Sequence, residues 1–268
     1  MKVDAAVERR LATVRTTPAG RLRGLRKFLP ILGILVIWHI LSRGVPDYIL
    51  PSPFLVAQTF YRSVVSGEIL IHLVMSMLRV FVGFGLAAIV GLAVGFFMAF
   101  SHFFRSQVDY LIRMVQPIPG IAWLGVVIIW FGLGETAIIT VIIITVLPVI
   151  VLTTYEGFRS VDPELMKAAR TLGARRQWHL FRYVTFPGAL PHVMNGLHMG
   201  FGYGWRVLAA AEMIGATQGL GYWLNYNAIA LRTEDVFVVL VFFAAAMIAF
   251  EEGVYRRVER RVLGGWLE

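Results

Sequence analysis

Between two long apolar runs the chain reads RSVDPELMKAARTLGARRQWHLFRYVTFPGALP, residues 159–191. This segment, the 159–191 loop, begins with the signals of a helix start. Asp162 is placed to cap the helix, Pro163 suits its first turn, and Glu164 puts an acid near its positive end. Gly173 suits a left-handed turn at the end of the helix, a conformation that residues with a Cβ disfavour. The sequence therefore predicts two short helices joined at Gly173.

Small and apolar side chains recur on one face of the first predicted helix, at Leu165, Ala168, Ala169 and Leu172. The second predicted helix contains Trp178 and Phe181, and Pro187 marks the return toward the next apolar run. A compact protrusion with an apolar face indicates a groove on a partner protein. The residues leave open an alternative, a basic loop that only fixes the topology against anionic lipid.

Composition indicates a membrane protein. The chain of 268 residues is 58% hydrophobic and 15% charged, whereas soluble domains carry about 25% charged residues. Its apolar residues come in runs of about 20, the length that spans a bilayer. The absence of cysteine excludes a disulfide scaffold, thiolate catalysis and a Cys-ligated metal site.

The hydropathy predicts an all-α polytopic membrane protein with about six transmembrane helices. The predicted spans cover residues 28–41, 72–100, 108–131, 136–155, 189–214 and 236–251. A further short amphipathic helix is predicted after Pro51, with Ser52 as its cap and Pro53 in its first turn. This helix either lies along the outer membrane surface or packs on neighbouring spans.

Positive charge is distributed unevenly over the predicted loops. Of the 25 Lys and Arg residues, eight lie within residues 1–27 and six within the 159–191 loop. Both segments, together with the C-terminal tail, are therefore predicted to face the cytoplasm. The predicted organisation is a basic N-terminal tail, residues 1–27, followed by one transmembrane domain, residues 28–268. Because the basic residues follow this membrane topology, we expect no nucleic-acid partner.

Ionisable residues within spans are costly and therefore mark functional candidates, so Arg206 and Glu212 are candidates for the translocation path. Arg206 and Glu212 both lie in the fifth predicted span, about 240° apart around the helix, so they cannot pair on one face. Arg206 either faces a water-filled cavity, where it would attract an anion, or is buried beside carbonyls or a carboxylate. Arg79 is expected to make packing hydrogen bonds.

Small residues recur every four positions in two spans, at Gly91 and Gly95 and at Gly196, Gly200 and Gly204. This spacing favours close helix packing in lipid. Gly200 and Gly204 are also candidates for the translocation path, because close helix approach at these positions would lie beside it.

An enzyme is disfavoured by the motifs that the sequence lacks. It has no G-x-x-x-x-G-K-[ST] phosphate loop, no H-E-x-x-H and no G-x-S-x-G, and its histidines are scattered. We therefore predict no catalytic residues, no metal site and no cofactor. The alternatives to an ATP-driven importer subunit are an intramembrane enzyme and a secondary transporter, which would be expected to show inverted repeats.

The 159–191 loop resembles the EAA loop of bacterial ABC-importer permeases, a coupling loop at about residues 157–188. Lys167, Ala168, Ala169 and Gly173 fall at the spacing x-A-A-x-x-x-G. Further motifs are PSP at 51–53, PIPGIAWLGVVIIWFGLGE at 117–135 and GWRVLAAAEMIGATQGLGYWL at 204–224. Together these resemble the permeases of the nitrate/sulfonate/taurine importer family, over about residues 50–266.

The resemblance implies a type I ABC-importer permease fold in the bacterial inner membrane. It implies two copies of the permease, two ATPase subunits that bind the ATP, and an extracytoplasmic substrate-binding protein that delivers a small anionic solute. The residues implied to couple the permease to its ATPase are Asp162, Glu164, Lys167, Ala168, Ala169, Gly173 and Pro187.

The sequence departs from the family pattern in two places. Lys167 stands where the EAA triplet has its acid, so an ion pair from this position to the ATPase would be reversed or absent. Pro119 is followed by GIAWLG, where many relatives place a further proline. The second departure predicts a less kinked third span.

Overall fold

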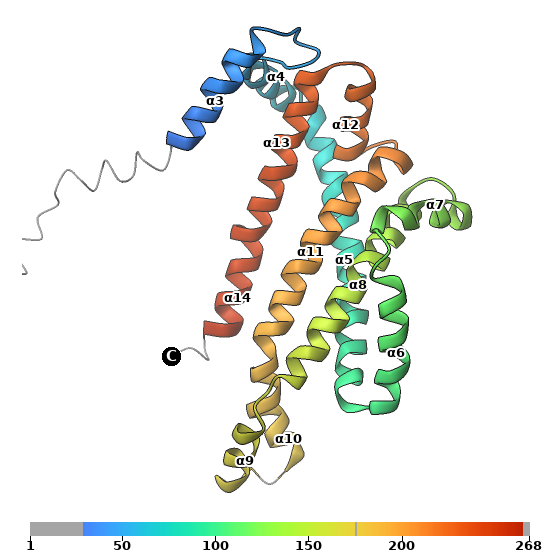
Figure 1. Ribbon diagram of the computed structural model, residues 1–268, viewed down its shortest axis with the longest axis vertical. Coiled ribbons are helices and arrows are strands. Elements are labelled where there is room, and N and C mark those ends of the chain that lie inside the picture. The colour runs from blue at the N-terminus through green and yellow to red at the C-terminus, as the bar shows by residue number, and fades with distance from the viewer. Residues whose placement is uncertain (1–28, 175, 265–268) are drawn as a thin grey trace, which may run out of the picture.

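The computed structural model describes residues 29–174 and 176–264, so the predicted tail, residues 1–27, lies outside the described residues (Figure 1). The described residues form helices and no strand. The elements are α3 Leu29–Ser42, α4 Pro53–Ser66, α5 Glu68–Phe100, α6 His102–Val115, α7 Gly120–Phe131, α8 Glu135–Arg159, α9 Pro163–Thr171, α10 Gln177–Leu180, the π-helix η1 Phe181–Thr185, α11 Phe186–Gly215, α12 Leu220–Ile229, α13 Thr233–Phe250, the π-helix η2 Glu251–Tyr255 and α14 Arg256–Leu263.

The bundle has two ends, which are easily told apart in Figure 1. α9 and α10 lie at one end, called here the loop end. α4 and α12 lie at the other, called the distal end.

Helix α8 packs between α5 and α11, and glycines on both neighbours allow the close approach. A Cβ at Gly91 of α5 would lie 3.0 Å from the Cβ of Ile150, and one at Gly204 of α11 would lie 3.0 Å from Cγ2 of Val146. Both Ile150 and Val146 belong to α8 and are fully buried. The predicted close packing at the glycine stripes is therefore confirmed.

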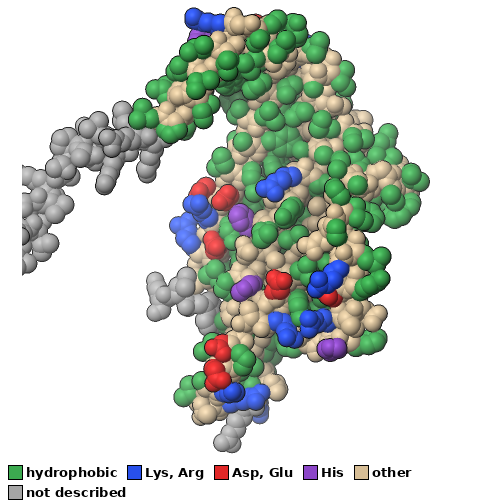
Figure 2. All heavy atoms as spheres, in the orientation of Figure 1, with side chains coloured by type: hydrophobic (Ala, Val, Ile, Leu, Met, Phe, Trp, Pro, Cys, Tyr) green, Lys and Arg blue, Asp and Glu red, His purple; other side chains and the backbone are tan. Residues whose placement is uncertain are grey.

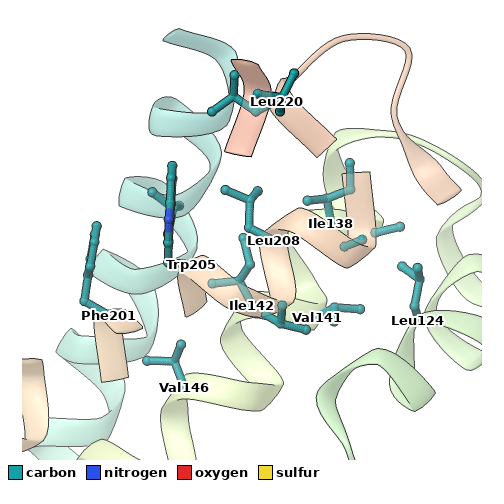
Figure 3. Packing of buried hydrophobic residues seen from close by; sticks show 14 of the residues in the cluster. Leu124, Ile138, Val141, Ile142, Val146, Phe201, Trp205, Leu208 and Leu220 are labelled. Carbon is teal, nitrogen blue, oxygen red and sulfur yellow. The ribbon is translucent and has the colours of Figure 1, made fainter. Parts of the chain in front are cut away.

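The core gathers around α8 (Figure 3). Ile142 of α8, Phe201 and Leu208 of α11, Leu124 of α7 and Leu220 of α12 are all buried in one cluster. Because lipid tails are as apolar as these side chains, burial in a membrane gives little hydrophobic driving force, and close packing stabilises the helix contacts instead.

The all-α polytopic fold is confirmed. Three long helices are apolar enough to cross a membrane, namely α5, α8 and Thr233–Leu263, and a fourth crossing results if α6 and α7 count as one bent span. α11 has 30 residues and runs beside α8, but it is less apolar. α3 has 14 residues, or about 21 Å, against a hydrocarbon thickness of about 30 Å. Each of the six predicted spans thus corresponds to helix, although α3 is short.

The expectation of a less kinked third span is wrong. α6 and α7 meet at an angle of 97°, and the helix breaks between Gln116 and Pro119. Two prolines within three residues, Pro117 and Pro119, remove backbone donors and disfavour helix in the residues before them. Gly120 then lets the turn approach α8 and α11, since a Cβ there would overlap Thr145 and lie 3.0 Å from Val207.

Helix α4 starts as predicted and packs on the spans. The Leu55 N–H donates to Oγ of Ser52 at 3.2 Å, and Pro53 occupies the first turn. Val56 is buried, and the ring of Phe60 stacks on Phe242 of α13 with centroids 5.2 Å apart. The second of the two alternatives, packing on neighbouring spans, therefore holds for α4.

Candidate functional site

The first helix of the 159–191 loop, α9, forms as the sequence predicts. The carboxylate of Asp162 accepts from the N–H of Glu164 at 2.8 Å. At the other end Gly173 has φ +101°, and the N–H of Ala174 donates to the carbonyl of Ala169 at 2.9 Å. The left-handed turn that Gly173 predicts is therefore confirmed.

The loop presents apolar side chains to its surroundings. Leu165 is 58% exposed, Leu172 88% and Trp178 61%. Ala168 is exposed as well, and Ala169 is half-buried. On the face that Figure 2 shows, charged side chains gather toward the loop end, over α6, α9 and η2–α14. The apolar protrusion at the end of α9 therefore lies in polar surroundings, where a partner would cover it.

Lys167 makes its ion pair inside α9. Its Nζ lies 2.8 Å from Oε1 of Glu164, and both side chains are about three-quarters exposed, at 70% and 74%. Exposed pairs of this kind contribute little to stability. Lys167 is therefore available to a partner surface at small cost.

The second predicted helix forms after Gly173, but it is not a separate short helix. α10, η1 and α11 follow one another without a break from Gln177 to Gly215. Pro187 lies in the first turn of α11 and has no N–H to donate. The chain widens into the π-helix η1 just before it, where the N–H of Phe186 donates to the carbonyl of Phe181. A π turn is a recognised way of accommodating such a helix irregularity.

Aromatic rings pack the 159–191 loop against the bundle. The ring of Phe181 stacks on Phe158 of α8 with centroids 6.3 Å apart and meets Phe96 of α5 edge-on at 5.8 Å. Trp178 lies 5.7 Å from Phe181. The loop is therefore in contact with both α5 and α8.

At the distal end, Arg79 of α5 connects three helices. It is 3% exposed, and its Nη1 donates to Oε1 of Glu212 at 2.6 Å. Its Nε donates to Oε2 of Glu135, the first residue of α8, also at 2.6 Å. Nη1 further donates to the carbonyl of Gln218 at 2.6 Å. The packing role predicted for Arg79 is confirmed, with two carboxylates as its partners.

The same cluster holds the turn between α11 and α12. Glu212 is fully buried and accepts from the N–H of Gly221 at 2.9 Å and from the hydroxyl of Ser76 at 2.7 Å. Nδ1 of His72 accepts from the N–H of Gly219 at 3.0 Å. Glu212 is thus satisfied within one chain. Its predicted place on the translocation path stays a prediction.

The sequence contains a signal for this cluster. Arg79 lies near the start of the second predicted span, Glu135 just before the fourth and Glu212 near the end of the fifth. In a topology of alternating spans these three positions share one membrane depth. Arg79, a charge that is costly inside the membrane, therefore has two carboxylate partners, Glu135 and Glu212, at its own membrane depth.

Arg206 lies on an exposed face of α11, so the alternative of a buried arginine is wrong. Its guanidinium carbon is 5.7 Å from the centroid of the Tyr203 ring. Within residues 29–174 and 176–264, no carboxylate lies within 4.0 Å of its nitrogens. Gly200 and Gly204 instead face α8 and are buried. Their place beside a translocation path stays a prediction.

A cavity of about 260 Å³ lies where α6 breaks into α7. Gln116 to Gly120 and Trp123 line it from the break, Thr145 and Pro148 from α8, and Tyr203 from α11. Non-helical backbone at membrane depth is tolerated only inside protein or beside water, so the cavity suits the break. The described part of the chain holds no cluster of side chains that could bind a metal ion.

Residues 87–264 match the family described as "Binding-protein-dependent transport system inner membrane component". The chain is 35% identical over 191 residues to the taurine transport system permease protein TauC of Escherichia coli, covering 71% of this chain and 69% of that protein. It is 30% identical to the putative aliphatic sulfonates transport permease protein SsuC of Bacillus subtilis, covering 98% and 97%. The nitrate import permease protein NrtB of Synechocystis is also 30% identical, covering 81% and 82%.

Two solved structures share the fold. One is an amino acid ABC transporter with histidines, with a TM-score of 0.63 and 19% identity over 75% of this chain and 97% of that one. The other is the MetNI methionine ABC transporter in an inward-facing conformation, with a TM-score of 0.57 and 22% identity over 70% and 92%. The chain belongs to the family of binding-protein-dependent inner membrane components: it is the transmembrane permease subunit of an ABC importer, which works with a binding protein and leaves ATP hydrolysis to a partner ATPase.

Proposed function

We propose that this permease imports a small anionic solute of the sulfonate, taurine or nitrate kind. Two copies form a homodimer, and two ATPase subunits dock on their 159–191 loops. A binding protein delivers the solute at the distal end. The observation that carries the proposal is the exposed apolar protrusion, whose Trp178 lies on α10, and α10 continues without a break into α11.

The docking surface comprises Leu165, Leu172 and Trp178, together with the small residues Ala168 and Ala169. The exposed leucines and tryptophan suit an apolar groove, and the two alanines allow close approach of the partner. Closure of the ATPase dimer on ATP moves α9. Because α10 continues into α11, that movement reaches the distal half of the membrane.

The charge distribution supports the orientation. The loop end carries Arg159, Lys167, Arg170 and Arg182, and α14 adds further arginines. By the positive-inside rule this end faces the cytoplasm, together with both termini. The distal end then faces the binding protein.

Two observations support this class of solute. The relatives are named for taurine, aliphatic sulfonates and nitrate, each of which presents an oxyanion group. Arg206, exposed on a crossing helix, supplies a matching charge.

The assembly is tested by affinity purification of the tagged chain from its native membranes, followed by native mass spectrometry. We expect two copies of this chain with two copies of one ATPase subunit. A second, different permease in the particle contradicts the homodimer, and absence of an ATPase contradicts docking.

The transport activity is tested in proteoliposomes that contain the purified complex and its binding protein. We expect ATP-dependent uptake of taurine, ethanesulfonate or nitrate, with ATP hydrolysis stimulated by the loaded binding protein. Uptake without ATP would contradict the proposed function.

A further inference from the structure

One face of α11 stays exposed over most of its length. Its residues recur at spacings of three, four and seven: Asn195, Met199, Tyr203, Arg206 and Met213. Met199, Tyr203 and Met213 are 42%, 41% and 36% exposed, while Gly200 and Gly204 face α8 and are buried. A face that carries an arginine and an asparagine at membrane depth borders protein or water, because the bilayer interior is a costly place for both.

This face meets the cavity at the break between α6 and α7. Tyr203 lines the cavity together with Trp123, and Arg206 lies beside the Tyr203 ring at 5.7 Å. The next residue of α11, Val207, packs against the break. Its Cγ2 would lie 3.0 Å from a Cβ at Gly120. The charge of Arg206 therefore lies beside Tyr203, a residue that lines the cavity.

The balance of charge around Arg206 favours an anion. The two carboxylates at the distal end of the bundle core, Glu135 and Glu212, are both bound by Arg79. Arg206 itself has no carboxylate within 4.0 Å among the described residues. A guanidinium presents a planar fork of donors that matches an oxyanion.

The cavity walls add donors and aromatic surface. The structure shows no hydrogen bond from the Tyr203 hydroxyl or the Trp123 indole N–H to any described residue. Thr145, by contrast, donates its hydroxyl to the carbonyl of Val141 at 2.8 Å, so it offers only acceptor capacity. The rings of Tyr203 and Trp123 also give an apolar wall against which the short carbon chain of a solute can pack.

We propose that Arg206, Tyr203 and Trp123 form an anion-binding site inside the membrane, at the break between α6 and α7, that holds an oxyanion solute during its passage. The inference deepens the proposed function and rests on it. A lipid phosphate offers Arg206 the same chemistry, and the experiment separates the two sources.

The chain contains no cysteine, so Met199→Cys places a single thiol on the exposed face of α11, two turns from Arg206. The full transporter in nanodiscs is treated, without ATP, with a sulfonate-bearing methanethiosulfonate (MTSES) and with its trimethylammonium counterpart (MTSET). Each labelling rate is divided by the rate of the same reagent with free cysteine. We expect the normalised rate for MTSES to exceed that for MTSET by about tenfold, the low end of electrostatic focusing in a cleft.

Adding Arg206→Gln is expected to bring this ratio to about one, because the charge that concentrates the sulfonate is lost. Arg62→Gln, at an exposed arginine of α4, is the matched control and should leave the ratio unchanged. Met213→Cys, on the same face beyond Arg206, serves as a second reporter if Met199→Cys does not assemble. Ile89→Cys, 70% exposed in the middle of α5, should react with neither reagent.

A normalised ratio near one with Arg206 present, or a ratio that Arg206→Gln leaves unchanged, overturns the site. So does a lack of labelling by both reagents at Met199→Cys and Met213→Cys, which would show that this face is closed to a free anion and leave a lipid phosphate as the only anion that could reach it. ATPase association and sulfonate uptake are measured on the same particles. Their failure rejects the proposed function, whereas a ratio of one beside normal uptake rejects only the site.

Discussion

Arg79 shows how one residue fixes the distal end of the bundle. It is bound to two carboxylates and one carbonyl, which come from α8, α11 and the turn after α11. Arg79→Ala would leave Glu212 as a fully buried charge without its cation. Breaking a buried pair in this way costs about 3–5 kcal/mol, so we expect a clear fall in the melting temperature of the purified complex.

The double variant Arg79→Met with Glu212→Leu is the informative comparison. It removes both buried charges and leaves Glu135, which is 54% exposed, to solvent. We expect it to recover much of the lost stability, because apolar residues of similar volume often replace buried ion pairs without loss. A double variant no more stable than Arg79→Ala would show that the pair is not the source of the effect.

Gly219 is required by the same cluster. Its φ is +120°, and a Cβ there would overlap the carboxylate of Glu212 and come within 2.6 Å of Nη1 of Arg79. Gly219→Ala should therefore destabilise the complex by roughly 1–3 kcal/mol from backbone strain alone. Gly125→Ala, in α7 with open space around it, is the control that thermal unfolding should find neutral. Equal melting temperatures for the two variants would refute the argument.

Residue-scale predictions from the sequence succeeded where the cause is local. Asp162 and Ser52 cap helices, and Gly173 adopts a positive φ, because each of these roles depends only on neighbours within a few residues. The ion pair of Glu212 was not predicted because its partner Arg79 is 133 residues away in the sequence. The short range of capping rules gives no information about such contacts.

At the scale of the element, the angle between α9 and α10 depends on Gly173. Gly173→Val adds a β-branched side chain at φ +101°, a strain of about 1–3 kcal/mol that is relieved by reshaping the loop. A Cβ has open space there, so steric overlap is not the cause. We expect the permease to insert and dimerise, while loaded binding protein no longer stimulates ATP hydrolysis and uptake stops.

Ala174→Val, one residue further on, is the control for Gly173→Val because it places the same valine side chain at a residue without a positive φ. It should retain most of the stimulated ATPase activity. Wild-type uptake by Gly173→Val would show that the loop is only a topological anchor.

Lys167→Glu restores the acid usual in the family and removes the ion pair to Glu164. Both side chains are largely exposed, so the effect on stability should be small. We expect stimulated ATPase activity within about fivefold of the native level, because an exposed pair typically contributes under 1 kcal/mol. A complete loss of ATPase association would instead place Lys167 at the centre of the docking contact.

The positions of the helices were predicted well from periodicity, and the connections between them less well. α5, α8 and α11 follow the predicted spans closely. The bend between α6 and α7 was not predicted, because its angle depends on how Gly120 fits against Thr145 and Val207 from other helices. The continuity of α10 with α11 was also missed, since two prolines normally indicate a helix boundary.

At the scale of the whole molecule, one helix connects the two ends that the transport cycle must couple. From Gln177 to Gly215 the chain is helical without interruption, and it carries the exposed Trp178 at one end and Arg206 in its distal half. The order of packing around α8 could not be read from the sequence, although the glycine stripes on its two neighbours indicated close contacts. A rigid α10–α11 would convert a movement of the 159–191 loop into a movement of the anion-binding face.

Rigidity of this helix is measurable because the chain has no native cysteine. Spin labels at Trp178→Cys and Met213→Cys are separated by 35 helical residues, or about 53 Å at 1.5 Å per residue. Labelled permease is diluted with unlabelled permease so that the measured distance lies within one chain. We expect the distance to stay within a few Å between the ATP-free and ATP-bound transporter, because the helix is continuous from Gln177 to Gly215, although Pro187 and Pro191 each remove one backbone donor. The pair Leu172→Cys and Met213→Cys, which spans the turn at Gly173, is the comparison in which a change is permitted. A nucleotide-dependent change in the Trp178–Met213 pair would place a hinge at η1 and show that the loop moves independently of α11.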